Sequence, residues 1–161
     1  MTTLFTFILF LIPLAALLTR IISIMQNAED RSFYASEALR EIIITTVLFT
    51  LLGPVAGLLV IALPFAFIAP PTLDGLLLFV IGSFAMGVVP ACLTGLSVGA
   101  LLPWLRARDE AWSAAWIGAL MAVIFALSNN RSYDGAKLIL ASACGAFAGF
   151  VVAKLNARLN H

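Results

Sequence analysis

Five long runs of apolar residues constrain this chain more than any other feature. They cover approximately residues 4–25, 42–63, 73–102, 112–127 and 136–155. A run of about 20 apolar residues forms a helix roughly 30 Å long, which matches the hydrocarbon core of a bilayer. The runs therefore predict an all-α, polytopic membrane protein with five transmembrane helices, organised as a single integral membrane domain over residues 1–161.

The composition excludes the other broad classes of protein. Hydrophobic residues make up 63% of the 161 residues and charged residues 11%, against about 45–50% and about 25% in soluble domains. The net charge of +1 provides no basic field for nucleic acid. Cys92 and Cys144 both lie inside apolar runs, so no disulfide framework is indicated. The bilayer is therefore the first expected partner, and nucleic acid is not expected as one.

The most polar stretch lies between the first two runs, from Gln26 to Glu41. Its charged residues are interleaved with apolar ones such as Phe33 and Tyr34. Two interpretations stay open here. The segment near 30–41 forms an interfacial helix lying at the membrane surface, or it extends the second transmembrane helix into solvent.

The distribution of basic residues predicts the orientation, because cytoplasmic loops are enriched in Lys and Arg. With five spans, one side carries two basic residues, Arg131 and Lys137. The other side carries seven, which are Arg20, Arg31, Arg40, Arg106, Arg108, Lys154 and Arg158. We therefore expect the N-terminus outside and the C-terminus in the cytoplasm.

Small residues recur at four-residue spacing, which lets the backbones of membrane helices approach closely. The candidate packing residues form pairs in the second, third and fifth runs: Gly53 and Gly57, Gly95 and Gly99, Gly145 and Gly149. They serve either packing within one chain or association with another chain. Gly145 and Gly149 are expected to tolerate Ala but not Leu or Ile.

Two prolines, Pro54 and Pro90, lie near the middle of their runs and predict kinks in both helices. Each removes one backbone hydrogen bond, which frees the carbonyls of Thr50 and Met86. Interrupted helices at matching depth can mark a solute or ion site, to which Thr94 would add a hydroxyl. The five residues therefore either border a cavity or belong to ordinary kinked helices.

The residue types missing from the apolar runs argue against an enzyme. No Asp, Glu or His lies deep in a run, and the one histidine is His161. Proton-coupled transport usually needs such an ionisable group, and Ser–His or Cys–His catalysis needs a histidine near the nucleophile. No residues have metal-ligand spacing. We therefore expect no enzymatic activity, no cofactor and no metal.

The segment Gly87–Gly95 resembles small bacterial inner-membrane proteins, which implies that location and no particular activity. The expected function is that of a small non-enzymatic membrane protein acting through helix packing. It would serve as an accessory or assembly subunit of a membrane complex, or as a homo-oligomer, so its partners would be other membrane subunits or itself. The alternative is a channel or uncoupled carrier for a small neutral solute.

Overall fold

A computed structural model describes residues 2–27, 31–68, 72–106, 109–129 and 135–159. These residues form five helices, all long and apolar enough to cross a membrane, which confirms the predicted all-α architecture. The helices are α1 (Thr2–Asn27), α2 (Arg31–Ile68), α3 (Leu73–Arg106), α4 (Glu110–Asn129) and α5 (Gly135–Leu159). A helix suits this environment because it satisfies its own backbone hydrogen bonds where no water is available.

The charged segment before the second apolar run belongs to α2 itself. This helix is continuous over 38 residues from Arg31, so residues 31–41 extend the second span and form no separate interfacial helix. Residue 30 lies outside the described residues. An exposed helix can carry charges on every side. The helix of the apolar run therefore extends back through the polar residues to Arg31.

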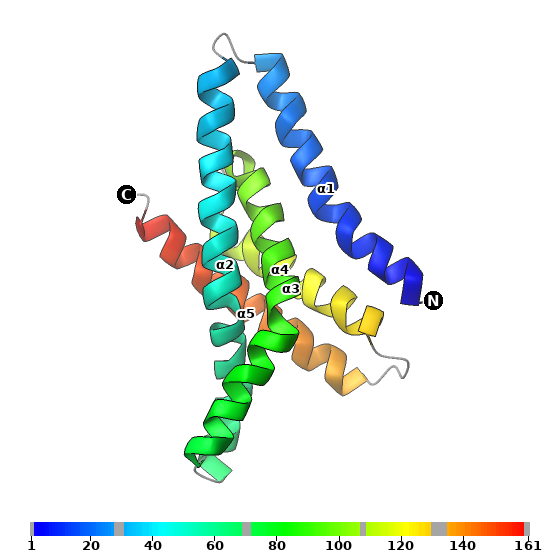
Figure 1. The fold of residues 1–161 in the computed structure, drawn as a ribbon, viewed down its shortest axis with the longest axis vertical. Coiled ribbons are helices and arrows are strands. Elements are labelled where there is room, and N and C mark those ends of the chain that lie inside the picture. The colour runs from blue at the N-terminus through cyan, green and yellow to red at the C-terminus, as the bar shows by residue number, and fades with distance from the viewer. Residues whose placement is uncertain (1, 28–30, 69–71, 107–108, 130–134, 160–161) are drawn as a thin grey trace.

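Both long helices continue through their central prolines. Pro90 lies inside α3, and Figure 1 shows that this helix changes direction in its middle, as a proline that removes a hydrogen bond would cause. Helix α2 passes through Pro54 without a break, and the kink expected there stays a prediction.

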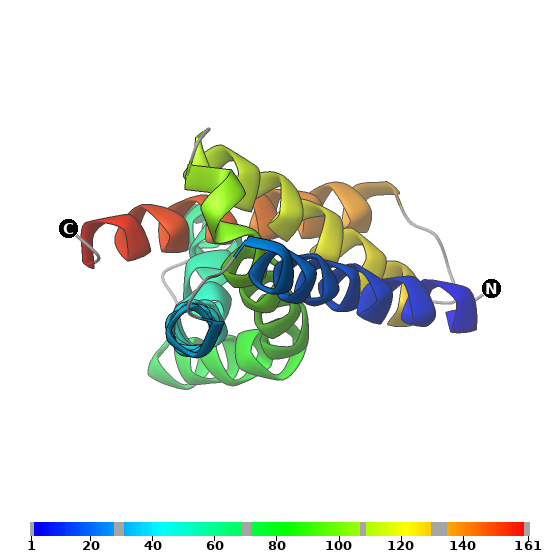
Figure 2. The same ribbon diagram turned by 90° about the horizontal axis from the view of Figure 1, so that it is seen from above.

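The helices pack as two antiparallel pairs with α1 added to one side. Helix α2 packs along α3, and α4 packs along α5. Figure 1 shows that the α4–α5 pair crosses α2 at a steep angle, and that the lower part of the α2–α3 pair extends beyond α4 and α5. Helix α1 contacts α3 and α4, and Figure 2 shows it running alongside α4.

The core described by the structure includes two clusters that share α3 and α4. The first cluster joins α2, α3, α4 and α5 and includes Phe49, Val98, Leu102 and Val152. The second joins α1, α3 and α4 through Leu9, Leu93, Met121 and Ile124. Since α3 and α4 both contribute to the two clusters, the C-terminal half of α3 and the helix α4 form the centre of the bundle.

An ion pair links α1 to α2. The Arg20 guanidinium donates to a carboxylate oxygen of Glu41 at 3.1 Å, and the two side chains are only 14% and 22% exposed. Such enclosure weakens the screening that makes fully exposed pairs contribute little. The pair therefore ties α1 to α2 at the level where the apolar run of α2 begins.

We expect Arg20→Ala and Glu41→Ala each to lower the free energy of unfolding by about 1–3 kcal/mol, because either change removes a charge-assisted hydrogen bond. In a double-mutant cycle the two effects should be coupled by about 1 kcal/mol. Thermal unfolding in detergent measures both quantities. Arg40→Ala, which removes an exposed arginine, is the matched control and should leave stability unchanged. Strictly additive effects of the two substitutions would contradict the coupling.

Candidate functional site

The predicted glycine pair of α3 lies directly against α2. A Cβ atom added at Gly95 would be 2.8 Å from the Thr46 Cα atom, and one added at Gly99 would be 2.9 Å from the Ile42 Cα atom. Packed Cβ atoms do not approach other heavy atoms so closely, so these positions have no room for a side chain. The C-terminal half of α3 therefore packs backbone to backbone on α2.

The glycines of α2 also lie at helix contacts, with more room. A Cβ atom at Gly53 would be 3.0 Å from the Ala91 Cβ atom, and one at Gly57 would be 3.7 Å from the Cys144 Cβ atom. The second distance is an ordinary van der Waals contact. Gly53 thus faces α3 and Gly57 faces α5.

Among the glycines that the structure describes, those of α4 and α5 have the least room. A Cβ atom at Gly145 would overlap the carbonyl oxygen of Gly118 and lie 2.7 Å from the Ala122 Cβ atom. One at Gly149 would overlap the carbonyl oxygen of Ala114 and lie 3.0 Å from the Ala115 Cα atom. The expectation that Gly145 and Gly149 tolerate Ala is therefore wrong, because the atoms in the way belong to backbone that cannot rotate aside.

The residues of α4 that form this contact with α5 were not identified from the sequence. Ala114, Gly118 and Ala122 follow one another at the same four-residue spacing as the stripes recognised in the other helices. That spacing could have identified them. A glycine opposite a glycine removes both side chains from the contact, which explains why α4 and α5 approach so closely.

The structure places Met86 apart from the other residues proposed to border a cavity. Pro54 is buried, and a Cβ atom added at Gly87 would lie 3.2 Å from its Cβ atom. The Met86 side chain is 75% exposed, so it points away from the packed interior. Helices α2 and α3 are thus in direct contact at the level of these residues.

The two threonines of this group donate hydrogen bonds within their own helices. The Thr50 hydroxyl donates to the Thr46 carbonyl and the Thr94 hydroxyl to the Pro90 carbonyl, both at 2.7 Å. Neither bond reaches across to the neighbouring helix. Pro90 itself is half-buried.

Asn156 is a buried polar residue just beyond the fifth apolar run, which was expected to end near residue 155. Helix α5 continues to Leu159, and the Asn156 side chain is 1% exposed. It lies one turn after Val152, a member of the first core cluster. The sequence did not indicate this position, because Asn side chains are mostly exposed and are rare in cores.

The described residues hold no group of three His, Cys, Asp or Glu that could bind a metal ion. Cys92 and Cys144 are free thiols, both half-buried. The side chains that the structure brings together are therefore small and apolar, and the arrangement they form is a set of helix contacts.

We expect Gly145→Ala and Gly149→Ala each to lower the free energy of unfolding by about 1–3 kcal/mol, the usual cost of an overpacked contact. Gly82→Ala is the matched control, since a Cβ atom there would meet nothing within 4 Å. That control should be neutral or slightly stabilising because Ala is the better helix former. Equal melting temperatures for all three variants would show that α4 and α5 are farther apart than the structure places them.

Comparison of the chain with protein-family models, with curated proteins and with solved structures finds no match. The helix contacts, the exposed faces and the distribution of charge are therefore the basis for a functional proposal.

Proposed function

We propose that this chain is a non-enzymatic integral membrane protein that acts by packing against other helices in the bilayer. It serves as an accessory or assembly subunit of a membrane complex, or as a homo-oligomer. We place it in the bacterial inner membrane, with the N-terminus outside and the C-terminus in the cytoplasm.

The observation that carries the proposal is the setting of Gly82 in α3. Among the described residues, a Cβ atom there would meet nothing within 4 Å, whereas one at each glycine from Gly87 to Gly99 in the same helix would meet α2. A glycine in the middle of a helix costs about 1 kcal/mol relative to alanine. Contacts within the chain offset that cost at the other positions, but they do not at Gly82.

The surroundings of Gly82 support the same reading. The N-terminal half of α3 is largely uncovered, with Leu78 71% and Ile81 64% exposed, and Ala85 is exposed next to Gly82. This half belongs to the part of the α2–α3 pair that extends beyond the other helices (Figure 1). This exposed face is open to a second helix, and Gly82 would let that helix approach closely.

The orientation rests on the alternation of the helix ends. Figure 1 shows the end of α1, the start of α2 and the end of α5 on one side of the molecule, with the start of α1, the end of α4 and the start of α5 on the other. The first side holds Arg20, Arg40, Lys154 and Arg158, and the second holds Lys137. Arg108 and Arg131 lie outside the described residues.

Reporter fusions test this orientation. Fusions after Arg108 and after His161 should report the cytoplasm, and a fusion within residues 129–134 should report the outside. An enzyme reporter that is active only in one compartment, paired with one active only in the other, provides the internal control. The reverse pattern would contradict the proposed orientation, and the same compartment for all three sites would contradict five crossings.

The packing role is tested by Gly82→Leu. We expect this variant to weaken association with a second copy or a co-purifying subunit by at least about tenfold, because a bulky side chain would hold the backbones apart. Measured on the dissociated single chain, its melting temperature should not fall, since among the described residues a Cβ atom at Gly82 meets nothing within 4 Å. The control is Ala15→Leu, which introduces the same side chain at an exposed position of a different helix, α1. The measurement is the mass of the particle in mild detergent, combined with identification of any co-purified protein.

A wild-type particle with the mass of one 17.2 kDa chain and no co-purified protein would contradict the proposal. Loss of association in Ala15→Leu to the same degree would contradict the role of Gly82. A channel or uncoupled carrier for a small neutral solute remains the alternative, and solute flux into reconstituted liposomes above that of empty vesicles would support it.

A further inference from the structure

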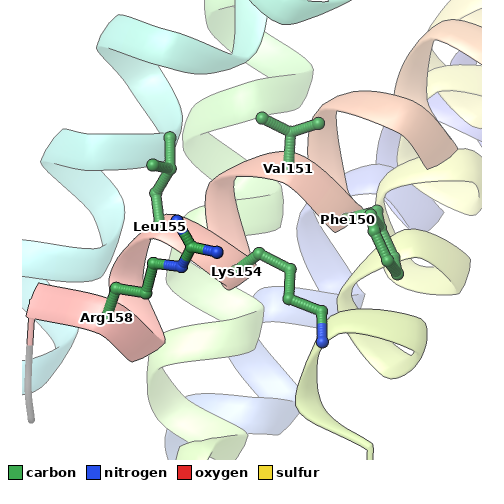
Figure 3. Close-up of a pocket in the computed structure, with 5 residues that line it drawn as sticks. All are labelled: Phe150, Val151, Lys154, Leu155 and Arg158. Carbon is green, nitrogen blue, oxygen red and sulfur yellow. The ribbon is translucent and has the colours of Figure 1, made fainter.

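A groove of about 240 Å³ lies on the last turns of α5. Figure 3 shows the five side chains that line it, which are Phe150, Val151, Lys154, Leu155 and Arg158. Phe150, Val151 and Leu155 present apolar surface. Lys154 and Arg158 are four residues apart, so they lie on the same face of the helix one turn from each other. The groove therefore combines an apolar lining with two cations at its edge.

The aromatic residues beside the groove place it where hydrocarbon gives way to headgroups. The Trp112 ring of α4 contacts the Phe150 ring edge-on, with ring centroids 5.4 Å apart. Trp112 is 60% exposed, and an exposed Trp on a membrane helix marks the interfacial zone. The Lys154 ammonium lies 5.7 Å from the centroid of the Phe150 ring, which holds this charge over the apolar lining.

Both cations are accessible. Lys154 and Arg158 are exposed, and they extend past the groove from a helix whose Val152 and Ala153 are buried in the core. Exposed basic residues at the end of a transmembrane helix reach the headgroups with their charged ends. Figure 3 shows Lys154 and Arg158 extending from neighbouring turns of α5, so that both cations border the same apolar lining.

We propose that this groove binds an anionic phospholipid. The Lys154 and Arg158 side chains would hold the headgroup phosphate, and Phe150, Val151 and Leu155 would contact the first part of an acyl chain. The combination selects a ligand that is both anionic and amphiphilic. A zwitterionic lipid gains less from two cations, and a free phosphate ion gains nothing from the apolar lining. Basic pockets at the ends of transmembrane helices recognise anionic headgroups by this chemistry.

The test uses the full chain, purified in mild detergent and titrated with phosphatidylglycerol or phosphatidylcholine, with bound lipid counted by native mass spectrometry. Wild-type protein should bind phosphatidylglycerol more tightly than phosphatidylcholine. The Lys154→Ala, Arg158→Ala double variant should bind phosphatidylglycerol roughly 30-fold more weakly, because each basic residue near a membrane surface contributes about a factor of five. Arg40→Ala removes an exposed arginine that does not line the groove and should change the affinity less than about twofold.

Two further variants separate this site from general attraction between charges. Val151→Phe fills the groove without changing the charge and should also weaken binding. Arg158→Lys keeps the positive charge, so this variant should retain most of the affinity for phosphatidylglycerol. Each variant is first shown to melt at the wild-type temperature. An Ala variant of Lys154 or Arg158 that melts at a lower temperature is replaced by the Gln variant at the same position.

Three results would overturn the proposal. The first is equal affinity of wild type and the double variant for phosphatidylglycerol. The second is equal loss of binding in Arg40→Ala, which would indicate attraction without a site. The third is full competition by glycerol phosphate, the headgroup without acyl chains, which would assign the groove to a small soluble anion instead. None of these outcomes depends on the association tested through Gly82.

Discussion

Close backbone contact at glycine holds this bundle together. Lipid tails are as apolar as leucine, so bringing apolar side chains together inside a bilayer gains little from the hydrophobic effect. What remains is van der Waals contact, which falls off steeply with distance. Gly95 and Gly99 bring α3 onto α2, and Gly145 and Gly149 bring α5 onto α4. The two helix pairs then share one core around Val98, Leu102 and Val152, which could not close if either pair stood farther apart.

The polar groups of the helices divide into two kinds. Hydroxyl groups such as those of Thr50 and Ser97 donate to carbonyls within their own helix, so they are satisfied before any tertiary contact forms. Arg20 and Glu41 instead join two different helices. The first kind allows a polar side chain to lie at membrane depth without a partner helix. The second kind fixes which helices are neighbours, and Glu41 lies directly before the second apolar run, where water and headgroups can solvate the charges during assembly.

The sequence was sufficient for the number and approximate bounds of the helices, because hydropathy over 20 residues outweighs every local preference. It was insufficient for the segment 31–41, since an exposed charged helix looks the same whether it follows the surface or extends a span. It was also insufficient to place Asn156 in the core, because a polar side chain predicts an exposed position. The error over Ala at Gly145 has a different cause. The room at a glycine depends on the residue opposite, here Gly118, and no feature of a single sequence shows which helices face each other.

The unequal lengths of the helices have a consequence for the surrounding membrane. The apolar span of α3 covers 33 residues, whereas that of α4 covers 20. At 1.5 Å per residue the first approaches 50 Å and the second 30 Å, and the hydrocarbon core is about 30 Å thick. Lipid therefore meets a much longer apolar surface along α3 than along α4. The protein accommodates this mismatch by tilting, or the bilayer accommodates it by thickening along α3. In either case the free energy of the protein in the membrane depends on the thickness of the bilayer.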